Sequence, residues 1–378
     1  MRKMASKKKL GLIVNPIAGM GGRVGLKGTD GQDILEKAIR LGAVPISPRK
    51  AVEALSRISS IKGSIELFTH PHEMGEEEAR ECTFDPNVVG SVPKAHTTPT
   101  DTKNAAKEML RLPVDLLLFA GGDGTARDIC EAVGEKLTVL GIPAGAKMHS
   151  GVFAINPERA GDLAARYLQE RVTSTREAEV MDVDEQAFRE DRVQARLYGY
   201  LRIPNDEDYV QASKASSPPE DKYVAEAIAS DFIENIQPDC AYIFGPGTTT
   251  RAIVEKMGLR KTLLGVDVVY NGRLLASDVN EKQLLELAKD RKTKIVVTVI
   301  GQQGFIFGRG SQQISPDIIK KVGKENIVVV ATPNKLTSLR GKPLLVDTDD
   351  RGVDAMMTGY LQVITGYRTR AAYRVRSS

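Results

Sequence analysis

The chain has 378 residues, of which 41% are hydrophobic and 27% charged, and its net charge at pH 7 is +4. This length suits two domains, and the small net charge gives no basic field that would attract nucleic acid. The 3 cysteines and 4 histidines form neither a disulfide framework nor a zinc-ligand spacing. No apolar run has the length of a membrane span or of a signal peptide's core. We therefore expect a cytoplasmic globular protein with no membrane and no nucleic acid among its partners.

The first predicted element is an apolar strand at 10–14, and a glycine-rich loop at 15–22 follows it. Asn15 is a residue type that hydrogen-bonds within its own turn. Gly19, Gly21 and Gly22 would allow successive N–H groups to form an anion-binding nest. The same glycines also fit a merely flexible loop, and the polar residues that follow fit a mobile lid or substrate loop.

Helices and strands then alternate along the first half of the chain. Apolar residues at helical spacing predict helices at 33–41, 50–61 and 100–112, and apolar runs predict strands at 65–68 and 116–120. The glutamates at 76–78 indicate an exposed helix face at 73–82. This alternation is typical of a parallel sheet with right-handed crossovers and one shared ligand edge.

The central strand ends abruptly in Gly121-Gly122-Asp123-Gly124-Thr125. The glycines let the backbone turn sharply and approach a bulky anion, since no Cβ intervenes. Asp123 stands at the carboxyl end of a buried strand, where α/β folds bind ligands, and the next helix points its free N–H groups to the same place. We interpret the motif as a phosphate site that holds a carboxylate. An ordinary strand-to-helix turn with Asp123 as N-cap is the alternative.

A third loop at a strand end follows the predicted strand 137–142 and contains Gly145, which we add to the candidate phosphate-binding residues. Asn156 and Pro157 are typical of the first residues of a helix. We expect residues 1–155 to form a nucleotide- and phosphate-binding domain with a parallel, Rossmann-like sheet.

The pattern changes between 179 and 219. An acidic run at 179–185 precedes an alternating segment at 192–201, which is typical of a half-buried antiparallel strand. A polar linker at 205–219 leads into a predicted helix at 218–236 with a capping box. The acidic runs suggest a metal, but a solvated hinge explains them more simply.

The alternation of strand and helix returns after residue 238. A strand at 241–244 ends in Gly245-Pro246-Gly247 and three threonines, so Gly247, Thr248, Thr249 and Thr250 are candidates for binding phosphate at a helix N-terminus. Threonine-rich helix caps are also ordinary.

The remaining elements complete a second α/β domain. Asn271-Gly272 predicts a hairpin at 264–276. Helices at 280–288 and 316–322 and strands at 295–300 and 327–331 follow. We expect this second domain, with some antiparallel strands, to cover 156–358. Residues 359–378 are expected to return to the first domain and end in a basic tail.

The glycine motifs resemble those of a known superfamily. Gly121–Thr125 resembles the motif shared by NAD kinases, diacylglycerol and sphingosine kinases and 6-phosphofructokinases. The loops at 15–22, 141–145 and 245–250 resemble the ATP-NAD kinase and AcoX-type branch, and the resemblance extends over most of the chain. This motif is specific for the superfamily and not for the acceptor substrate.

The resemblance implies phosphoryl transfer from ATP, with Mg²⁺, to the 2′-hydroxyl of the adenosine ribose of NAD. It assigns Asp123 as the base or metal-orienting group, and Asp128 is a second candidate Mg²⁺ ligand. Lys147 and Arg251 are candidates for balancing the charge that develops. The kinase Gly-Ser-Thr loop resembles Gly247-Thr248-Thr249.

Two features depart from the NAD kinase pattern. Those enzymes hold a ribose with an Asn-Glu pair, whereas Asn280-Glu281 here opens an ordinary helix. The second half also alternates helix and strand where NAD kinases are β-rich. Two alternatives stay open: a kinase of another hydroxyl acceptor, lipid or small metabolite, and a nucleotide-binding AcoX-type protein without catalysis. We expect a homo-oligomer in each case.

Overall fold

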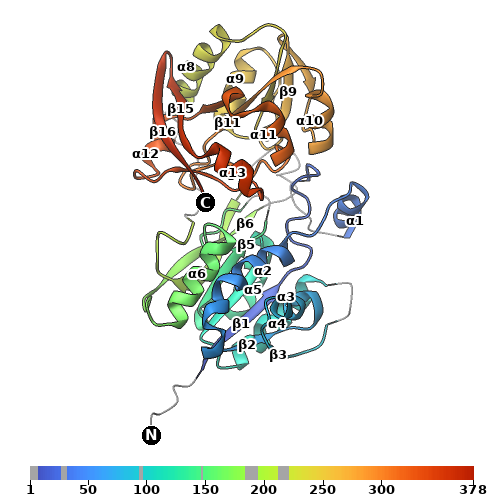
Figure 1. The fold of residues 1–378 in the computed structure, drawn as a ribbon, viewed down its shortest axis with the longest axis vertical. Helices are drawn as coiled ribbons and strands as arrows, with labels where there is room; N and C mark the ends of the chain where they lie inside the picture. Colours follow the sequence, from blue (N-terminus) through green and yellow to red (C-terminus); the bar gives the residue numbers. More distant parts are fainter. Residues whose placement is uncertain (1–6, 27–31, 93–96, 146–147, 184–194, 212–220) are drawn as a thin grey trace. The chain divides into compact units, whose positions relative to one another are not determined.

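The computed structural model describes residues 7–26, 32–92, 97–145, 148–183, 195–211 and 221–378, and it divides the chain into two compact units (Figure 1). The first unit holds the described residues up to 20, between 32 and 183, and between 195 and 211. The second unit holds 21–26 and 221–378. Both units are α/β, and the second contains antiparallel strands, so the predicted fold class is confirmed.

The first unit is built on a five-stranded parallel sheet in the order β3-β2-β1-β4-β5. The strands are β1 (Lys8–Val14), β2 (Ile65–Thr69), β3 (Asn87–Val88), β4 (Leu116–Gly121) and β5 (Val139–Pro143). The chain moves from β1 to one side and later places β4 on the other side. The strand order therefore reverses between β1 and β4, and a reversal of this kind opens a ligand crevice at the carboxyl ends of the strands.

Helices cover both faces of this sheet. The helices of this unit are α1 (Gln32–Arg40), α2 (Ser47–Ile58), α3 (Glu76–Glu81), α4 (Pro99–Arg111), α5 (Asp123–Val133) and α6 (Pro157–Leu168), with short 3₁₀ turns η1 (Ser59–Ser64), η2 (His72–Met74) and η3 (Gly134–Lys136), and α1 contributes no residue to the core of the sheet. Helix α2 packs beside α6, and α4 packs beside α5. The chain crosses the sheet in both directions, and right-handed crossovers in opposite directions place their helices on opposite faces of the sheet. The pair α2–α6 therefore lies on one face and the pair α4–α5 on the other. Every residue of β4 is buried, as its apolar sequence predicts.

The first unit extends beyond the predicted boundary at 155. Helix α6, capped by the Asn156 side chain, and an antiparallel ribbon of β6 (Thr175–Val183) and β7 (Ala195–Pro204) belong to it. Ala178, Val180 and Leu201 of the ribbon join the first core. The acidic composition of this segment obscured β6 in the sequence, because Glu179 lies between the buried residues Ala178 and Val180. The capping box expected at 217–220 lies outside the described residues.

The second unit is built on a nine-stranded mixed sheet in the order β10-β9-β8-β11-β13-β15-β16-β14-β12. Its strands are β8 (Cys240–Phe244), β9 (Asp267–Tyr270), β10 (Arg273–Ala276), β11 (Lys292–Thr298), β12 (Phe305–Phe307), β13 (Ile327–Val330), β14 (Leu344–Val346), β15 (Gly359–Gly366) and β16 (Thr369–Ser377). Neighbours β8, β11 and β13 run parallel, whereas β9 and β10 form the predicted antiparallel hairpin.

Two layers of helices enclose this second sheet. The helices are α8 (Asp221–Glu234), α9 (Thr248–Lys256), α10 (Glu281–Leu287), α11 (Pro316–Val322), α12 (Pro333–Thr337) and α13 (Arg351–Met357), with η4 (Lys324–Asn326). Residues of α8 and α9 pack on one face of the sheet, and residues of α10, α11 and α13 pack on the other. The alternation of buried side chains along β8 separates these two cores.

Residues 359–378 do not return to the first domain. They form the hairpin β15–β16, and β15 pairs with β13 in the second sheet (Figure 1). The backbone N–H of Arg368 in the hairpin turn and the guanidinium of Arg370 both donate to Asp231 of α8. The arginines of the expected basic tail are therefore part of a hairpin, with Arg368 in its turn and Arg370, Arg374 and Arg376 in β16. Among the described residues, no helix is both long and apolar enough to span a bilayer.

Candidate functional site

Three loops meet at the carboxyl edge of the first sheet, after β1, β4 and β5. The Gly121 carbonyl accepts hydrogen bonds from the backbone N–H groups of Ala144 (2.9 Å) and Gly145 (3.2 Å). Since β1 and β4 flank the reversal of strand order, the loops stand where an α/β sheet binds its ligand.

Asn15 ties the first loop to the Gly-Gly-Asp-Gly-Thr turn. Its side-chain amide donates to the hydroxyl of Thr125 at 2.9 Å, and its side-chain oxygen accepts from the Ile17 N–H at 3.3 Å. The second bond is the turn-fixing bond that the sequence predicts. Two candidate residues 110 positions apart therefore touch directly.

The glycines of these loops are required by close contacts. A Cβ at Gly121 would lie 2.3 Å from the Thr125 hydroxyl, and a Cβ at Gly145 would lie 2.9 Å from the Cα of Gly122. At Gly19, where φ is +81°, a Cβ would lie 2.0 Å from the Ala144 carbonyl oxygen. The backbones pack directly on one another, and a ligand can approach the N–H groups with no side chain between.

Asp123 is the first residue of α5 and follows the N-cap Gly122, so the alternative in which Asp123 caps the helix is wrong. One of its carboxylate oxygens accepts from the His149 backbone N–H at 2.7 Å and the other from the Ser150 N–H at 3.0 Å. The His149 ring nitrogen Nδ1 lies 3.5 Å from the first oxygen. The Asp123 side chain is only 10% exposed. These bonds fix its orientation, and each carboxylate oxygen retains capacity to accept another hydrogen bond.

His149 and Ser150 were not singled out from the sequence, although they lie in the third loop that was predicted at the end of β5. The Ser150 hydroxyl accepts from the Met181 N–H at 2.9 Å, and the Ser150 carbonyl accepts from the Gln211 side chain at 2.9 Å. The β6–β7 ribbon therefore supports the segment that holds Asp123. In the sequence, only their position in a loop after a parallel strand could have indicated that His149 and Ser150 belong to the site.

The nest expected of Gly19, Gly21 and Gly22 stays a prediction, and the three glycines fall in two units. The loop passes into the second unit at residue 21, and a Cβ at Gly22 would meet the Gln312 side chain at 3.1 Å. The Arg23 carbonyl accepts from the Glu281 N–H at 3.3 Å, next to the N-cap Asn280. Among the described residues of this loop, Gly19 and Gly25 have a positive φ.

Asp128 is buried and lies 3.7 Å from the ammonium of Lys103 on α4. Five residues of an α-helix turn through about 500°, so Asp128 and Asp123 face different directions on α5. Among the described residues no group of three or more His, Cys, Asp or Glu side chains could hold a metal ion. A Mg²⁺ held mainly by donor phosphates and water still fits, because such an ion needs only one or two protein carboxylates.

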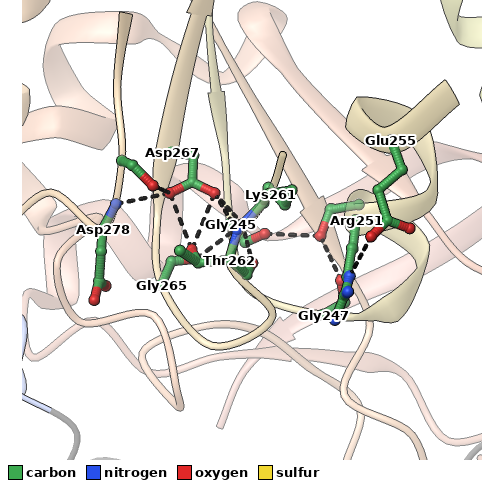
Figure 2. Close-up of polar contacts among 11 residues, drawn as sticks. Gly245, Gly247, Arg251, Glu255, Lys261, Thr262, Gly265, Asp267 and Asp278 are labelled. Carbon is green, nitrogen blue, oxygen red and sulfur yellow. Dashed lines mark hydrogen bonds and ion pairs between the residues drawn. The ribbon is translucent and has the colours of Figure 1, made fainter. Parts of the chain in front are cut away.

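The turn after β8 in the second unit contains the four predicted phosphate-binding residues, Gly247, Thr248, Thr249 and Thr250. Gly247 is the N-cap of α9 with φ +132°, and a Cβ there would lie 2.4 Å from the Thr298 side chain. The Thr250 hydroxyl donates to the carbonyls of Gly245 and Gly247, so it closes the turn. Thr249 is buried and Thr248 is exposed. Arg251 pairs with Glu255 at 2.6 Å (Figure 2), and Lys147 lies outside the described residues.

A buried ion pair supports this turn from the neighbouring loop (Figure 2). The side chains of Lys261 and Asp267 are both fully buried, with 3.3 Å between the ammonium and a carboxylate oxygen. Asp267 also accepts from Thr262, Ser277 and the Asp278 N–H. The same loop offers the Leu263 carbonyl to the Gly247 N–H at 2.9 Å.

Two family models match this chain: the ATP-NAD kinase N-terminal domain over residues 10–172 and the ATP-NAD kinase C-terminal domain over residues 238–375. Together they cover most of the sequence, and the chain belongs to the ATP-NAD kinase family. The second match corrects the expectation that the second half departs from this family. The helices of the second half cover a sheet of nine strands, and the sequence pattern predicted fewer strands than this.

Among solved structures, one described as a "putative diacylglycerol kinase" from Bacillus anthracis str. Sterne is similar over 72% of this chain, at 14% identity and a TM-score of 0.24. The match covers 64% of that protein's length. No curated protein matches the chain significantly.

Proposed function

We propose that this protein is an ATP-dependent kinase that phosphorylates the 2′-hydroxyl of the adenosine ribose of NAD to give NADP. One observation carries the proposal: a fixed, largely buried carboxylate, Asp123, stands at the reversal of strand order in a chain that both ATP-NAD kinase domains match. Phosphoryl transfer requires positioning and charge stabilisation more than covalent chemistry by the protein.

The backbone of the first unit supports a role in holding the donor phosphates. The first turn of α5 leaves N–H groups without helical acceptors, and the helix dipole favours an anion there. The close approach of Gly122 to Gly145 keeps side chains away from these groups. Asp123 is the carboxylate of this turn that could hold a Mg²⁺ ion, and such an ion would neutralise negative charge on the donor phosphates.

Asp123 would accept a hydrogen bond from the acceptor hydroxyl and aim its oxygen at the terminal phosphorus of ATP. As the new P–O bond forms, the bond between that phosphorus and the ADP oxygen breaks, and the carboxylate takes the hydroxyl proton. The two N–H bonds from His149 and Ser150 hold the carboxylate in place for this step, because they leave its side chain little freedom to rotate.

The test is an NADP-formation assay with ATP, Mg²⁺ and NAD, run on the wild type, Asp123→Asn and the control Asp162→Asn. Asp162 pairs with Arg57 on the surface of the same unit, so its loss changes a charge without touching the motif. We expect NADP from the wild type and the control only. Wild-type-like turnover by a folded Asp123→Asn would refute the assigned role, and no NADP from the wild type would redirect the search to other hydroxyl acceptors.

A further inference from the structure

We propose that Gln211 is a positioning residue for Asp123, and that the segment between the two family domains serves to hold this carboxylate in place. The N-terminal family model ends at residue 172, and the C-terminal model begins at residue 238. The β6–β7 ribbon and Gln211 lie between these limits and belong to the first unit. The effect on catalysis rests on the proposed function, whereas the hydrogen-bonded support does not depend on it.

Ser150 connects this segment to the carboxylate through all three of its polar groups. Its backbone N–H donates to Asp123 at 3.0 Å, its hydroxyl accepts from the Met181 N–H at 2.9 Å, and its carbonyl accepts from the Gln211 side-chain amide at 2.9 Å. The residue is completely buried, so water does not replace a bond that is lost. The position of Ser150 therefore depends on the ribbon and on Gln211.

The peptide group between Ser150 and Gly151 is fixed at both ends by the same segment. The Gly151 N–H donates to the Glu179 carbonyl of β6 at 2.8 Å, and the Ser150 carbonyl is the acceptor for Gln211. A peptide group is planar, so two bonds at opposite ends fix its plane. The adjoining peptide group carries the N–H that holds Asp123. A rotation of the first peptide group would therefore move this donor.

Gln211 is itself held in a definite position. Its backbone N–H donates to the Phe153 carbonyl at 2.9 Å, and its neighbour Val210 forms an antiparallel bridge with Ala154. The residue is only 3% exposed, which leaves the side-chain amide little freedom to rotate. Residues 209–211 thus pair with residues 153–155, and the amide reaches back to Ser150 from a fixed backbone.

The orientation of Asp123 matters because the proposed step aligns an acceptor hydroxyl with the terminal phosphorus of ATP. A displacement of about 1 Å in such a site can cost about 100-fold in rate. Gln211 acts through Ser150 and Asp123, so its loss should lower kcat and leave the affinity for the donor unchanged. Its loss should cost nothing further once Asp123 has been replaced.

The first measurement is amide hydrogen exchange of the full chain, followed at residues 149 and 150. Gln211→Met keeps a side chain of similar volume and removes the donor, and Gln169→Met, at an exposed position at the end of α6, is the matched control. We expect both amides to exchange about tenfold faster in Gln211→Met and at the wild-type rate in the control. Unchanged exchange in a folded Gln211→Met would overturn the support.

The second measurement is a double-mutant cycle on kcat for NADP formation, with Gln211→Met and Asp123→Asn. Gln211→Met alone should lower kcat about 10- to 100-fold and change the KM for ATP less than about threefold. In the Asp123→Asn background the same substitution should have no effect on kcat. Equal losses in both backgrounds would overturn the positioning role, and so would a folded Gln211→Met with the kcat of the wild type.

Gln211→Asn provides the same test if the methionine variant does not fold. Its amide is one methylene short of the Ser150 carbonyl, and the same losses of protection and of kcat are expected.

The two measurements keep this proposal distinct from the proposed function. If the wild type forms no NADP while the Gln211 variants lose protection at residues 149 and 150, the kinase function falls and the support remains. If NADP forms and the folded Gln211 variants keep the wild-type kcat, the positioning role falls and the kinase function remains.

Discussion

The turns after β4 and β8 both lead from a buried parallel strand into a helix, and each carries a side chain of opposite charge. In each, a glycine after the strand is the N-cap of the helix, and a threonine hydroxyl lies against the turn. The first turn then presents a carboxylate, Asp123, held by backbone N–H groups, whereas the second presents an ammonium, Lys335, held by hydroxyls. The two turns therefore share a position at the end of a parallel strand and differ in the charge beside it, a carboxylate in the first and an ammonium in the second.

The largest expected effect is at the carboxylate of the first turn. Asp123→Asn should lower kcat by about 10²- to 10⁴-fold with little change in ADP affinity, because the carboxylate acts on the acceptor hydroxyl. Steady-state kinetics with ATP and NAD measure this loss, and Asp162→Asn on the surface of the same unit is the matched control. A folded Asp123→Asn variant with the kcat of the wild type would show that the carboxylate of this turn does not act on the hydroxyl.

A second prediction concerns the buried support of the turn after β8. Asp267→Asn should lower the free energy of unfolding by about 3–5 kcal/mol, because it leaves the fully buried Lys261 ammonium without its counter-charge. Arg251→Ala, which breaks a partly exposed pair with Glu255, should cost no more than about 1 kcal/mol. Urea unfolding of both variants measures the difference, and similar losses would argue that the buried pair does not support the loop.

The third prediction concerns the close backbone contacts of the first turn. Gly19 and Gly42 have nearly equal φ, +81° and +84°, but a Cβ at Gly42 would meet nothing within 4 Å. Gly42→Ala therefore reports the conformational cost alone, about 1–2 kcal/mol. Gly19→Ala should cost about 1–3 kcal/mol more, because its Cβ collides with the Ala144 carbonyl. Thermal unfolding compares the two; equal shifts would mean that the loops do not touch as described.

The sequence was sufficient to predict the fold class and most elements, because apolar runs and glycine turns have local causes. Asn15, Gly121 and Thr125 could be grouped from their place after parallel strands, and the structure joins Asn15 to Thr125 directly. The supports of Asp123 could not be predicted, since His149 and Ser150 act through backbone N–H groups, which every residue has. The assignment of Gly21 and Gly22 to the second unit could not be predicted either, because a glycine indicates freedom of the backbone and not which unit the backbone joins.

The two units also differ in the partners of a buried carboxyl group. Asp267 in the second unit has a cation and several hydrogen-bond donors, whereas the Oε2 atom of Glu78 in α3 of the first unit is buried without a partner among the described residues. Burial raises the pKa of Glu78 from 4.5 to about 7. Glu78 should therefore be mostly protonated in the folded chain below pH 7, while the unfolded chain releases this proton near its usual pKa.

This difference gives the smallest prediction, a dependence of stability on pH. Between pH 4.5 and 7 the folded chain binds more protons at Glu78 than the unfolded chain, so the free energy of unfolding should fall as the pH rises, by up to about 3 kcal/mol. Glu78→Gln removes the titrating group and should lose less stability than the wild type between pH 5 and pH 8. Urea unfolding at the two pH values measures this; parallel losses in both proteins would mean that Glu78 is ionised in the fold, with a partner or water at its second oxygen.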